Sequence, residues 1–456
     1  MLTILSAENE NTPLLIIAGQ EIKRPQGSSA RQAWCAQTEN ERLVNKPPSG
    51  LSEKLSDHLV QESLHLSKGK VFLEKIGCNE EYEPSDCDFD KFDLVTVDDY
   101  DRCGPAKLPL IDRNYFLGAA GRRTTYKRNK NAFDEIKIVP RMLRDVSRNT
   151  LESSTLGMNV DFPIGLSPVA LQRLAHPDGE LATVAGISPF RTIMILSSYA
   201  STLLEEVARA AQNTSIHLWM QMYIFDNRTW TSTLIRRAEM SGFKGIVITA
   251  DSPVHGTVTC DGRRKIIKDG KANVENIDVS KVKSSSSAVF RDIKWLRSLT
   301  KLPIIIKGLL SGADATRAIL AGASAILVSN HGGRQMDGDP ATIEALPGVV
   351  DAVNKLYPRR DVYLDGGVRS GQDIYKAIAR GAKMVFIGRP IVWGLAIEGA
   401  QGVNNVITIL RNEFNETMLL SGASNVKEIK RDTLIPRIPF WSMLNFRMPN
   451  GTFTNP

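Results

Sequence analysis

The chain has 456 residues, a formal net charge of +7 and 42% hydrophobic residues. That length allows one large domain with an appendage, or two domains, and the hydrophobic content suffices for a packed core. No apolar run approaches the roughly 18 residues of a membrane span, and the opening residues lack the pattern of a secretory signal. The basic clusters come without an aromatic RNA platform or a DNA-reading helix, so we expect no nucleic acid or membrane partner. A basic surface that attracts small anionic substrates is the more economical interpretation.

The cysteines are odd in number and form no CxxC pair; they are Cys35, Cys78, Cys87, Cys103 and Cys260. This spacing supports neither a disulfide framework nor a zinc site. We therefore expect the cysteines to stay reduced, in an intracellular protein without a bound metal.

Residues 1–90 differ in composition from the rest of the chain. They are rich in Glu, Lys, Ser, Asn and Pro and have weak periodicity, which predicts a low-complexity, disordered extension with a short helix near 51–66. Residues 91–440 form the main domain and 441–456 a C-terminal tail.

Short apolar runs alternate with amphipathic segments from about residue 160 onward. Near-continuous apolar strands that alternate with helices predict a parallel sheet buried on both faces. Eight such units in roughly 250 residues match an α/β fold of the (β/α)8 barrel type. A doubly wound sheet is the weaker alternative, because no GxGxxG opens a helix after the first strand. The expected strands are 163–167, 192–196, 217–222, 245–250, 303–307, 325–329, 362–364 and 384–387, and the expected helices include 202–212, 231–242, 312–321 and 372–380.

Residues of types that act in catalysis or ligand binding follow nearly every predicted strand. Barrel enzymes place their active sites at these C-terminal strand ends. The most informative block is Ser329–Gln335, in which His331 can take a proton near neutral pH and Arg334 can grip a carboxylate. The alternative interpretation of this block alone is a surface loop with a capping histidine and a solvated arginine. The seventh and eighth strands lead into Gly366, Gly367 and Arg369 and into Gly388 and Arg389, which together favour a phosphate-bearing cofactor.

Several motifs in one order resemble the FMN-dependent 2-hydroxy acid oxidase and dehydrogenase family, which includes glycolate oxidase. They are SNHGGRQMDGDPATIEAL at 329–346, LDGGVRSGQDIYKAIARGA at 364–382 and FIGRP at 386–390. The resemblance extends from about 93 to 430. It implies FMN-dependent oxidation of a small (S)-2-hydroxy acid to a 2-oxo acid, with molecular oxygen reduced to hydrogen peroxide.

The resemblance also implies roles for individual residues. His331 matches the active-site base, Asp251 the carboxylate that orients it, and Tyr223 a phenol that hydrogen-bonds the substrate hydroxyl. A helix cap is the alternative role for Asp251 and a core tyrosine for Tyr223. The residues expected at the rest of the substrate site are Arg334 and Tyr115 at the carboxylate and Tyr199 at the substrate side chain.

The cofactor residues that the resemblance implies line the flavin ring, its ribityl chain and its phosphate. Lys307 matches a lysine beside the flavin, which would explain a buried lysine that is otherwise costly. The family usually has a threonine at the position of Val169. The full expected set is Pro168, Val169, Ala170, Ser197, Gln221, Thr249, Lys307, Asp365, Gly366, Gly367, Arg369, Gly388 and Arg389.

The chain departs from the family at Val258, where a second substrate arginine is usual; Arg263 or Arg264 is a candidate replacement. Loss of a charged hydrogen bond costs about 1.5–3 kcal/mol. The alternatives are therefore an impaired or non-catalytic FMN-binding paralogue, or a dehydrogenase with another acceptor. The resemblance further implies a peroxisomal homo-oligomer, a tetramer in many relatives, but the chain ends Thr454-Asn455-Pro456 and not in an SKL-type address, so a cytoplasmic location stays open.

Overall fold

The computed structural model describes residues 94–254, 256, 258–259 and 273–436, together with Leu15–Ile17, Gln20–Ile22 and Cys87. The chain divides into two compact units, residues 1–73 and residues 74–456. In the first unit, β1 (Leu15–Ile17) and β2 (Gln20–Ile22) form an antiparallel pair. The predicted disorder of 1–90 and helix near 51–66, as well as the 441–456 tail, fall almost entirely outside the described residues.

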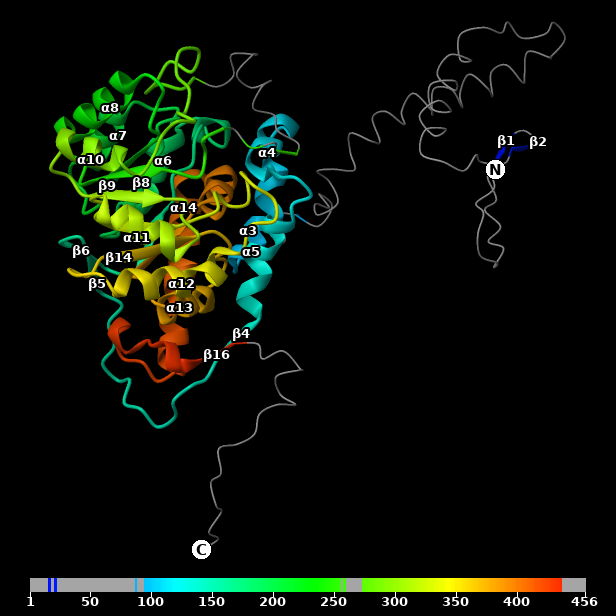
Figure 1. Ribbon diagram of the computed structural model, residues 1–456. Helices are drawn as coiled ribbons and strands as arrows, with labels where there is room; N and C mark the ends of the chain where they lie inside the picture. Colours follow the sequence, from blue (N-terminus) through cyan, green and yellow to red (C-terminus); the bar gives the residue numbers. More distant parts are fainter. Residues whose placement is uncertain are drawn as a thin grey trace, which may run out of the picture. The chain divides into compact units, whose positions relative to one another are not determined.

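The second unit is a closed barrel of eight parallel strands, which confirms the predicted fold class (Figure 1). Every predicted strand is present to within one or two residues. Around the barrel the order is β10-β12-β13-β14-β15-β7-β8-β9. The strands are β7 (Ile164–Leu166), β8 (Ile193–Leu196), β9 (His217–Met222), β10 (Gly245–Thr249), β12 (Ile304–Lys307), β13 (Ala325–Val328), β14 (Asp361–Asp365) and β15 (Met384–Ile387).

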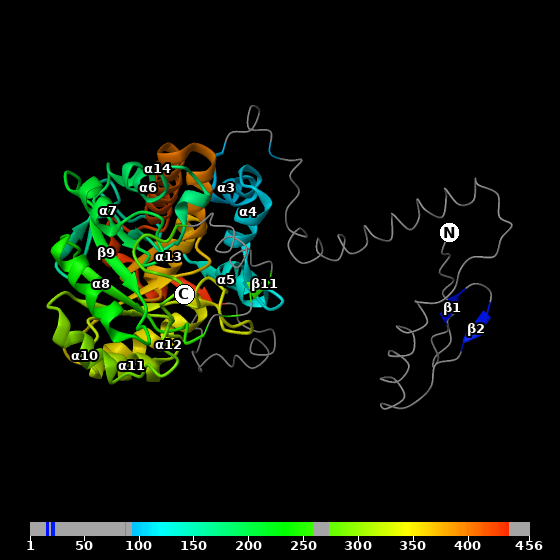
Figure 2. The same ribbon diagram turned by 90° about the horizontal axis from the view of Figure 1, so that it is seen from above.

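A helix follows each barrel strand and covers its outer face (Figure 2). The four predicted helices are confirmed as α7, α8, α11 and α13. Several begin at a capping side chain; Ser370, for example, accepts a hydrogen bond from the backbone N–H of Asp373 and forms a capping box with it at the start of α13. The helices are α6 (Gly179–Ile187), α7 (Leu204–Ala211), α8 (Arg228–Met240), α10 (Asp292–Leu299), α11 (Gly312–Leu320), α12 (Thr342–Asn354), α13 (Gly371–Ala379) and α14 (Arg389–Leu420).

Two hydrophobic clusters occupy the two faces of the strands. Along β8, Ile193 and Ile195 belong to the cluster inside the barrel, whereas Met194 and Leu196 face the helices. Trp219 and Tyr363 pack at a tilt inside the barrel, with 5.7 Å between ring centroids. Successive side chains of a strand point to opposite faces, so both faces need apolar residues. This is why the strands are continuous apolar runs rather than alternating ones.

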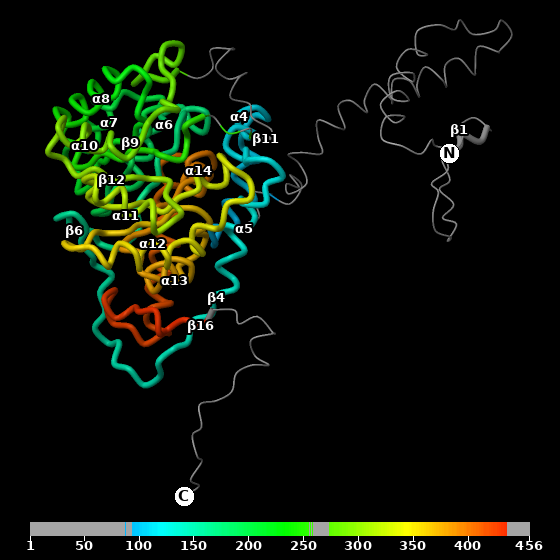
Figure 3. Tube along the Cα trace, viewed as in Figure 1, coloured from blue at the N-terminus to red at the C-terminus, as the bar shows by residue number. Residues whose placement is uncertain are grey.

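Three helices that precede the barrel lie along its outside, where α3 packs against α14 and α5 packs against α12 (Figure 2). They are α3 (Val97–Cys103), α4 (Leu110–Leu117) and α5 (Thr124–Asp134). The chain continues through three small antiparallel sheets. They pair β3 (Ala119–Ala120) with β11 (Val258–Thr259), β4 (Ile136–Ile138) with β16 (Leu434–Pro436), and β5 (Ser153–Thr155) with β6 (Met158–Val160). Figure 3 shows β4 and β16, which are distant in sequence, side by side.

The expectation that all cysteines stay reduced is wrong for two of them. Cys103, the last residue of α3, forms a disulfide with Cys87, 16 residues earlier. The odd cysteine count and the absence of a CxxC pair gave no sign of this bond, because pairing depends on which residues the fold brings together. The disulfide ties the C-terminal end of α3 to the segment that precedes it.

Candidate active site

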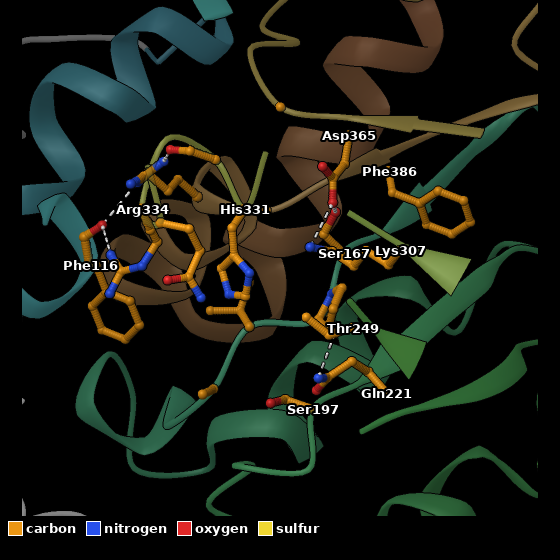
Figure 4. A pocket seen from close by; sticks show the side chains of 18 of the residues that line it. Phe116, Ser167, Ser197, Gln221, Thr249, Lys307, His331, Arg334, Asp365 and Phe386 are labelled. Atoms are coloured by element: carbon orange, nitrogen blue, oxygen red, sulfur yellow. Dashed lines mark hydrogen bonds and ion pairs between the residues drawn. The ribbon is translucent and has the colours of Figure 1, made fainter. Parts of the chain in front are cut away.

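A cavity of about 270 Å³ opens at the C-terminal ends of the barrel strands. Its walls come from every strand end and from α4 and α5, and they contain nearly all the residues predicted to be functional; Figure 4 shows 18 of the lining residues. Parallel strands end on one rim of the barrel, so residues far apart in sequence converge there. The predicted residues that line it are Tyr115, Pro168, Val169, Ala170, Ser197, Tyr199, Gln221, Tyr223, Thr249, Lys307, His331, Arg334, Asp365, Gly366, Gly367, Arg369, Gly388 and Arg389.

His331 and Asp251 form a hydrogen-bonded pair beside this cavity. Nδ1 of His331 lies 2.8 Å from Oδ1 of Asp251. Burial tends to raise the pKa of Asp251, but the charges of His331 and Lys307 outweigh it and hold that pKa below its ordinary range. The ionised carboxylate accepts the Nδ1–H proton, so Nε2 is the basic nitrogen.

The His331 side chain is set up as a neutral base. Burial lowers its pKa below the ordinary 6.5, and the charges of Lys307 and Arg334 lower it further, while Asp251 opposes them. A histidine whose pKa lies below neutrality is unprotonated at pH 7 and can accept a proton. Its side chain remains 25% exposed, toward the cavity that it lines.

The backbone at His331 is held in an unusual conformation. His331 has φ of 59°, in the left-handed region that non-glycine residues rarely adopt. The side chains of Asn129 and Asn330 exchange two hydrogen bonds of 2.8 Å, and Asn330 also accepts from the backbone N–H of Gly333. Ser329 accepts from the His331 backbone N–H at 3.1 Å. These contacts surround His331 and support its strained backbone.

Lys307 is buried in the floor of the cavity with three polar neighbours. Its Nζ donates to Ser329 Oγ at 2.9 Å and lies 3.7 Å from Asp365 Oδ2 and 4.0 Å from Asp251 Oδ2. The lysine is therefore not unpaired within the protein, since two carboxylates lie within 4.0 Å of it, and its place beside a flavin stays a prediction. Gly308 follows it with φ of 106°; a Cβ there would lie 2.6 Å from the Asp251 side chain, so glycine leaves room for that carboxylate.

Arg334 and Tyr115 meet on the wall opposite Lys307. In the view of Figure 4, Arg334 and Phe116 lie on one side of His331, and Lys307, Ser167 and Asp365 on the other. Nη1 of Arg334 donates to the backbone carbonyls of Tyr115 and Gly118, each at 2.9 Å. The guanidinium carbon lies 5.3 Å from the centroid of the Tyr115 ring. The C-terminal end of α4 thus orients the guanidinium, a contribution that the sequence pattern did not reveal.

Tyr199 and Tyr223 form a second aromatic wall, with ring centroids 5.7 Å apart in an edge-to-face arrangement. The segment 273–282 lies beside this wall and is joined to it by a hydrogen bond from the backbone N–H of Glu275 to the carbonyl of Ala200. Three valines of this segment line the cavity and were not expected from the sequence; they are Val274, Val279 and Val282. Tyr199 and these valines give the cavity an apolar section.

A polar strip connects the ends of three neighbouring strands. Gln221 donates through Nε2 to Thr249 Oγ1 at 2.9 Å, and its Oε1 accepts from the backbone N–H of Ser198 (Figure 4). Ser197 directly precedes Ser198, the donor in this bond, and the Oγ of Ser197 accepts from the backbone N–H of Tyr199. The strip matches the positions expected along a flavin ring and ribityl chain.

The end of the cavity at β14 and β15 is cationic. Gly366 and Gly367 have φ of 90° and 87°, which a turn of this shape requires. Arg369 lines the cavity with Lys130 of α5, which was not predicted. Arg389 also lines it, but its guanidinium donates to the backbone carbonyls of Phe116, Gly118 and Gly332, each at 2.9 Å.

These residues fit the expected FMN. Gly388 does not have a positive φ, and a Cβ built on it would meet no described atom closer than 3.8 Å, with Ser167 and Val169 the nearest. The missing side chain thus leaves space in the cavity that no described protein atom requires. Cations at one end suit a phosphate, and the polar strip suits the ribityl hydroxyls and ring edges.

Val258 does not line the cavity. It is 8% exposed, pairs with Ala120 in the β3–β11 sheet, and its Cγ1 would lie 2.6 Å from a Cβ at Gly118. Its side chain therefore packs against the loop that Arg334 grips. The candidate replacements Arg263 and Arg264 lie outside the described residues.

Among the residues that the structure describes, no group of three or more His, Cys, Asp or Glu side chains could hold a metal ion. No helix among those residues is long and apolar enough to cross a membrane.

Comparison with known proteins identifies relatives along most of the chain. Residues 106–436 match a family model described as FMN-dependent dehydrogenase. 2-Hydroxyacid oxidase 1 of Homo sapiens is 42% identical over 366 residues, which cover 76% of this chain and 97% of that protein. The peroxisomal (S)-2-hydroxyacid oxidase GLO4 of Arabidopsis thaliana is 41% identical over 353 residues, covering 74% of this chain and 96% of the relative.

Solved structures resemble the barrel as well. Mandelate oxidase with (S)-4-hydroxymandelic acid aligns with a TM-score of 0.69 at 32% identity. The alignment covers 75% of this chain and 98% of that structure. The likeness therefore includes nearly the whole of the related structure.

Proposed function

The chain belongs to the FMN-dependent dehydrogenase family, and we propose that the cavity at the strand ends is where it carries out this chemistry. The protein is an FMN-dependent 2-hydroxy acid oxidase that converts an (S)-2-hydroxy acid to the 2-oxo acid and reduces oxygen to hydrogen peroxide. The substrate loses the proton of its hydroxyl group and a hydride equivalent from the carbon that bears this hydroxyl. When bound, FMN accepts that hydride equivalent and passes its two electrons to oxygen.

His331 is the proposed base, and its pairing with Asp251 is the observation that carries the proposal. The 2.8 Å contact fixes the tautomer with Nε2 as acceptor, and the lowered pKa keeps the ring neutral before the reaction. When Nε2 takes the substrate proton, the adjacent carboxylate stabilises the imidazolium that forms. Asp251 therefore acts on the base and not on the substrate.

Arg334, Tyr115 and Tyr223 are the proposed substrate-binding residues. The backbone carbonyls that hold Nη1 of Arg334 orient the planar fork, and a fixed guanidinium can grip a carboxylate with two parallel hydrogen bonds. Tyr115 lies under that guanidinium, and Tyr223 stands at the other aromatic wall of the cavity. This arrangement would hold the acid with its hydroxyl-bearing carbon near His331.

We propose that the apolar section takes the side chain of the substrate. Tyr199 and the three valines would bury an aliphatic chain, and each buried methylene contributes about 0.8 kcal/mol, or roughly fourfold in kcat/KM. Acids with a short to medium aliphatic chain should therefore react better than glycolate, up to the length that the cavity admits. A series from glycolate to 2-hydroxyoctanoate measures this; a monotonic fall with chain length would contradict it.

The main experiment mixes the purified yellow protein anaerobically with these acids and follows the flavin absorbance. We expect bleaching by at least one acid, followed by hydrogen peroxide formation when oxygen is admitted. A protein that holds FMN but that no 2-hydroxy acid bleaches would support the non-catalytic alternative suggested by Val258. Bleaching without peroxide on exposure to oxygen would support a dehydrogenase with another acceptor.

We also propose a peroxisomal homo-oligomer. The similar Arabidopsis protein is a peroxisomal oxidase by its name, and peroxisomes contain the hydrogen peroxide that such a reaction releases. Co-localisation of the full-length chain with a peroxisomal marker tests the location, and a diffuse cytoplasmic signal would contradict it. Light scattering tests the assembly; a mass of 50.3 kDa would identify a monomer.

A further inference from the structure

Asp101 is a buried carboxylate with two cationic partners and no role in the reaction described above. It lies on α3, outside the barrel, and its side chain is 9% exposed. Its Oδ2 accepts from Arg369 Nε at 2.6 Å and from Lys130 Nζ at 3.3 Å. One oxygen atom therefore joins α3, α5 and the loop after β14.

The two cations face the cavity, whereas the carboxylate does not. Lys130 and Arg369 both line the cavity beside Gly366 and Gly367, but Asp101 is not among the lining residues. Arg369 uses Nε for Asp101 and Nη1 for the carbonyl of Val368, at 2.9 Å. Its Nη2 makes no hydrogen bond with the described residues, and the Arg369 side chain is one of those that line the cavity.

The charges of this cluster support an anion site. Burial tends to raise the pKa of Asp101, yet Arg369 and Lys130 bring it below its ordinary value, so the carboxylate is ionised. Two cations and one anion leave one net positive charge at this end of the cavity. Asp101 Oδ1 is buried without a hydrogen-bond partner among the described residues, which is costly for a group that served only to tether α3.

We propose that Asp101 is a positioning residue for the phosphate of FMN. It holds the long side chains of Arg369 and Lys130 in one orientation, with their free N–H groups toward the cavity, and so reduces the entropy that each would lose on binding phosphate. Lys130 is then a second phosphate-binding cation. The inference rests on FMN being the cofactor in this cavity.

A competition between FMN and riboflavin isolates the phosphate contribution, because riboflavin has the same ring and ribityl chain without the phosphate. The full-length holoenzyme is equilibrated with an excess of both flavins and passed through a rapid desalting column, and the bound flavins are separated and quantified. We expect Asp101→Asn to lower the bound FMN-to-riboflavin ratio roughly ten- to hundredfold, the effect of losing charge-assisted hydrogen bonds. Asp98→Asn is the matched control: this carboxylate is exposed on the same helix and acts on Arg369 only through its charge, so the ratio should change far less than in Asp101→Asn.

A double-mutant cycle tests whether Asp101 acts through its partner. Arg369→Gln should lower the ratio by itself, and adding Asp101→Asn should then lower it far less than in the wild-type background. Equal effects in both backgrounds would overturn the positioning role. If Asp101→Asn fails to fold, Lys130→Gln replaces it in the same assay; an unchanged ratio for that variant would also overturn the proposal.

Two other outcomes have distinct meanings. An unchanged ratio in Asp101→Asn together with a lower melting temperature would mean that Asp101 only tethers α3. A raised ratio would mean that the carboxylate chiefly repels the phosphate. A wild-type protein that retained neither flavin would instead contradict FMN as cofactor, so failure of that assignment is distinguishable from failure of this inference.

Discussion

The two ends of the cavity are built in different ways. At the reacting end, the base His331, its partner Asp251 and the buried Lys307 all lie at or just after the ends of barrel strands. At the cationic end, Arg369 follows a strand, but its orientation depends on Asp101 and Lys130, which lie on helices outside the barrel. His331 and Asp251 thus meet directly between two barrel strands, with Asn129 of α5 supporting the loop through Asn330, whereas the cationic end depends for its orientation on two residues of the segment that precedes the barrel. Substitutions at the two ends should separate chemistry from cofactor retention.

The largest effect is expected for His331→Gln, which removes the base and keeps a side chain of similar size. Flavin reduction by the best substrate should slow by about 10²–10⁴-fold, the usual contribution of a positioned general base. FMN should stay bound, because the cationic end is untouched. Stopped-flow absorbance measures the first effect and the flavin-to-protein ratio the second. Loss of FMN in this variant would break the distinction between the two ends.

Removal of the disulfide should affect FMN retention at the cationic end of the cavity. In the chain-entropy model, a bond that closes a loop of about 16 residues contributes roughly 3 kcal/mol, so Cys103→Ser should lower the free energy of unfolding by about that amount. Because Cys103 ends the helix that carries Asp101, FMN retention should fall more than the turnover of the loaded enzyme. Denaturant unfolding and flavin release on dilution measure the two quantities. The wild-type protein in reductant is the control and should resemble the variant; an equal loss of turnover at saturating FMN would contradict the prediction.

Arg334→Lys tests the carboxylate grip at the reacting end. A lysine side chain cannot both donate to the backbone carbonyls and present a planar guanidinium to the substrate carboxylate. The lost interaction is about 1.5–3 kcal/mol, so kcat/KM should fall roughly ten- to over a hundredfold. If Arg334 binds the substrate carboxylate, the substitution should lower kcat/KM less for the amide of the substrate than for the acid. Equal losses for the acid and the amide would show that Arg334 has only a structural role.

The smallest effect concerns pH. The neutral form of His331 is the proposed active one, and burial lowers its pKa below the ordinary 6.5, so the acid limb of kcat/KM should have its midpoint below pH 6.5. Asp251 raises the pKa of His331, hence Asp251→Asn should move this acid limb to lower pH while it reduces the maximum rate. A limb with its midpoint above pH 6.5 in the wild-type protein would mean that His331 is charged in the free enzyme.

The strands and the residues that follow them could be predicted from the sequence for a simple reason. A strand buried on both faces must be an apolar run, and parallel strands in a barrel end on one rim, so a local pattern locates both the strand and its chemistry. That is why His331, Lys307 and Gly388 were found without tertiary information. The family resemblance added roles to them but did not change their place.

Tertiary structure decided what no local pattern records. The pairing of Cys87 with Cys103, the grip of the Tyr115 and Gly118 carbonyls on Arg334, and the burial of Val258 away from the cavity each join segments through space. The two carboxylates beside Lys307 gave this lysine partners that the sequence pattern did not indicate. The sequence by itself determined the barrel and the positions of its reactive side chains, because hydrophobic burial sets both locally. Only the folded chain determined how those side chains are held and charged, since hydrogen bonds and electrostatic fields depend on distances between atoms that the order of residues does not contain.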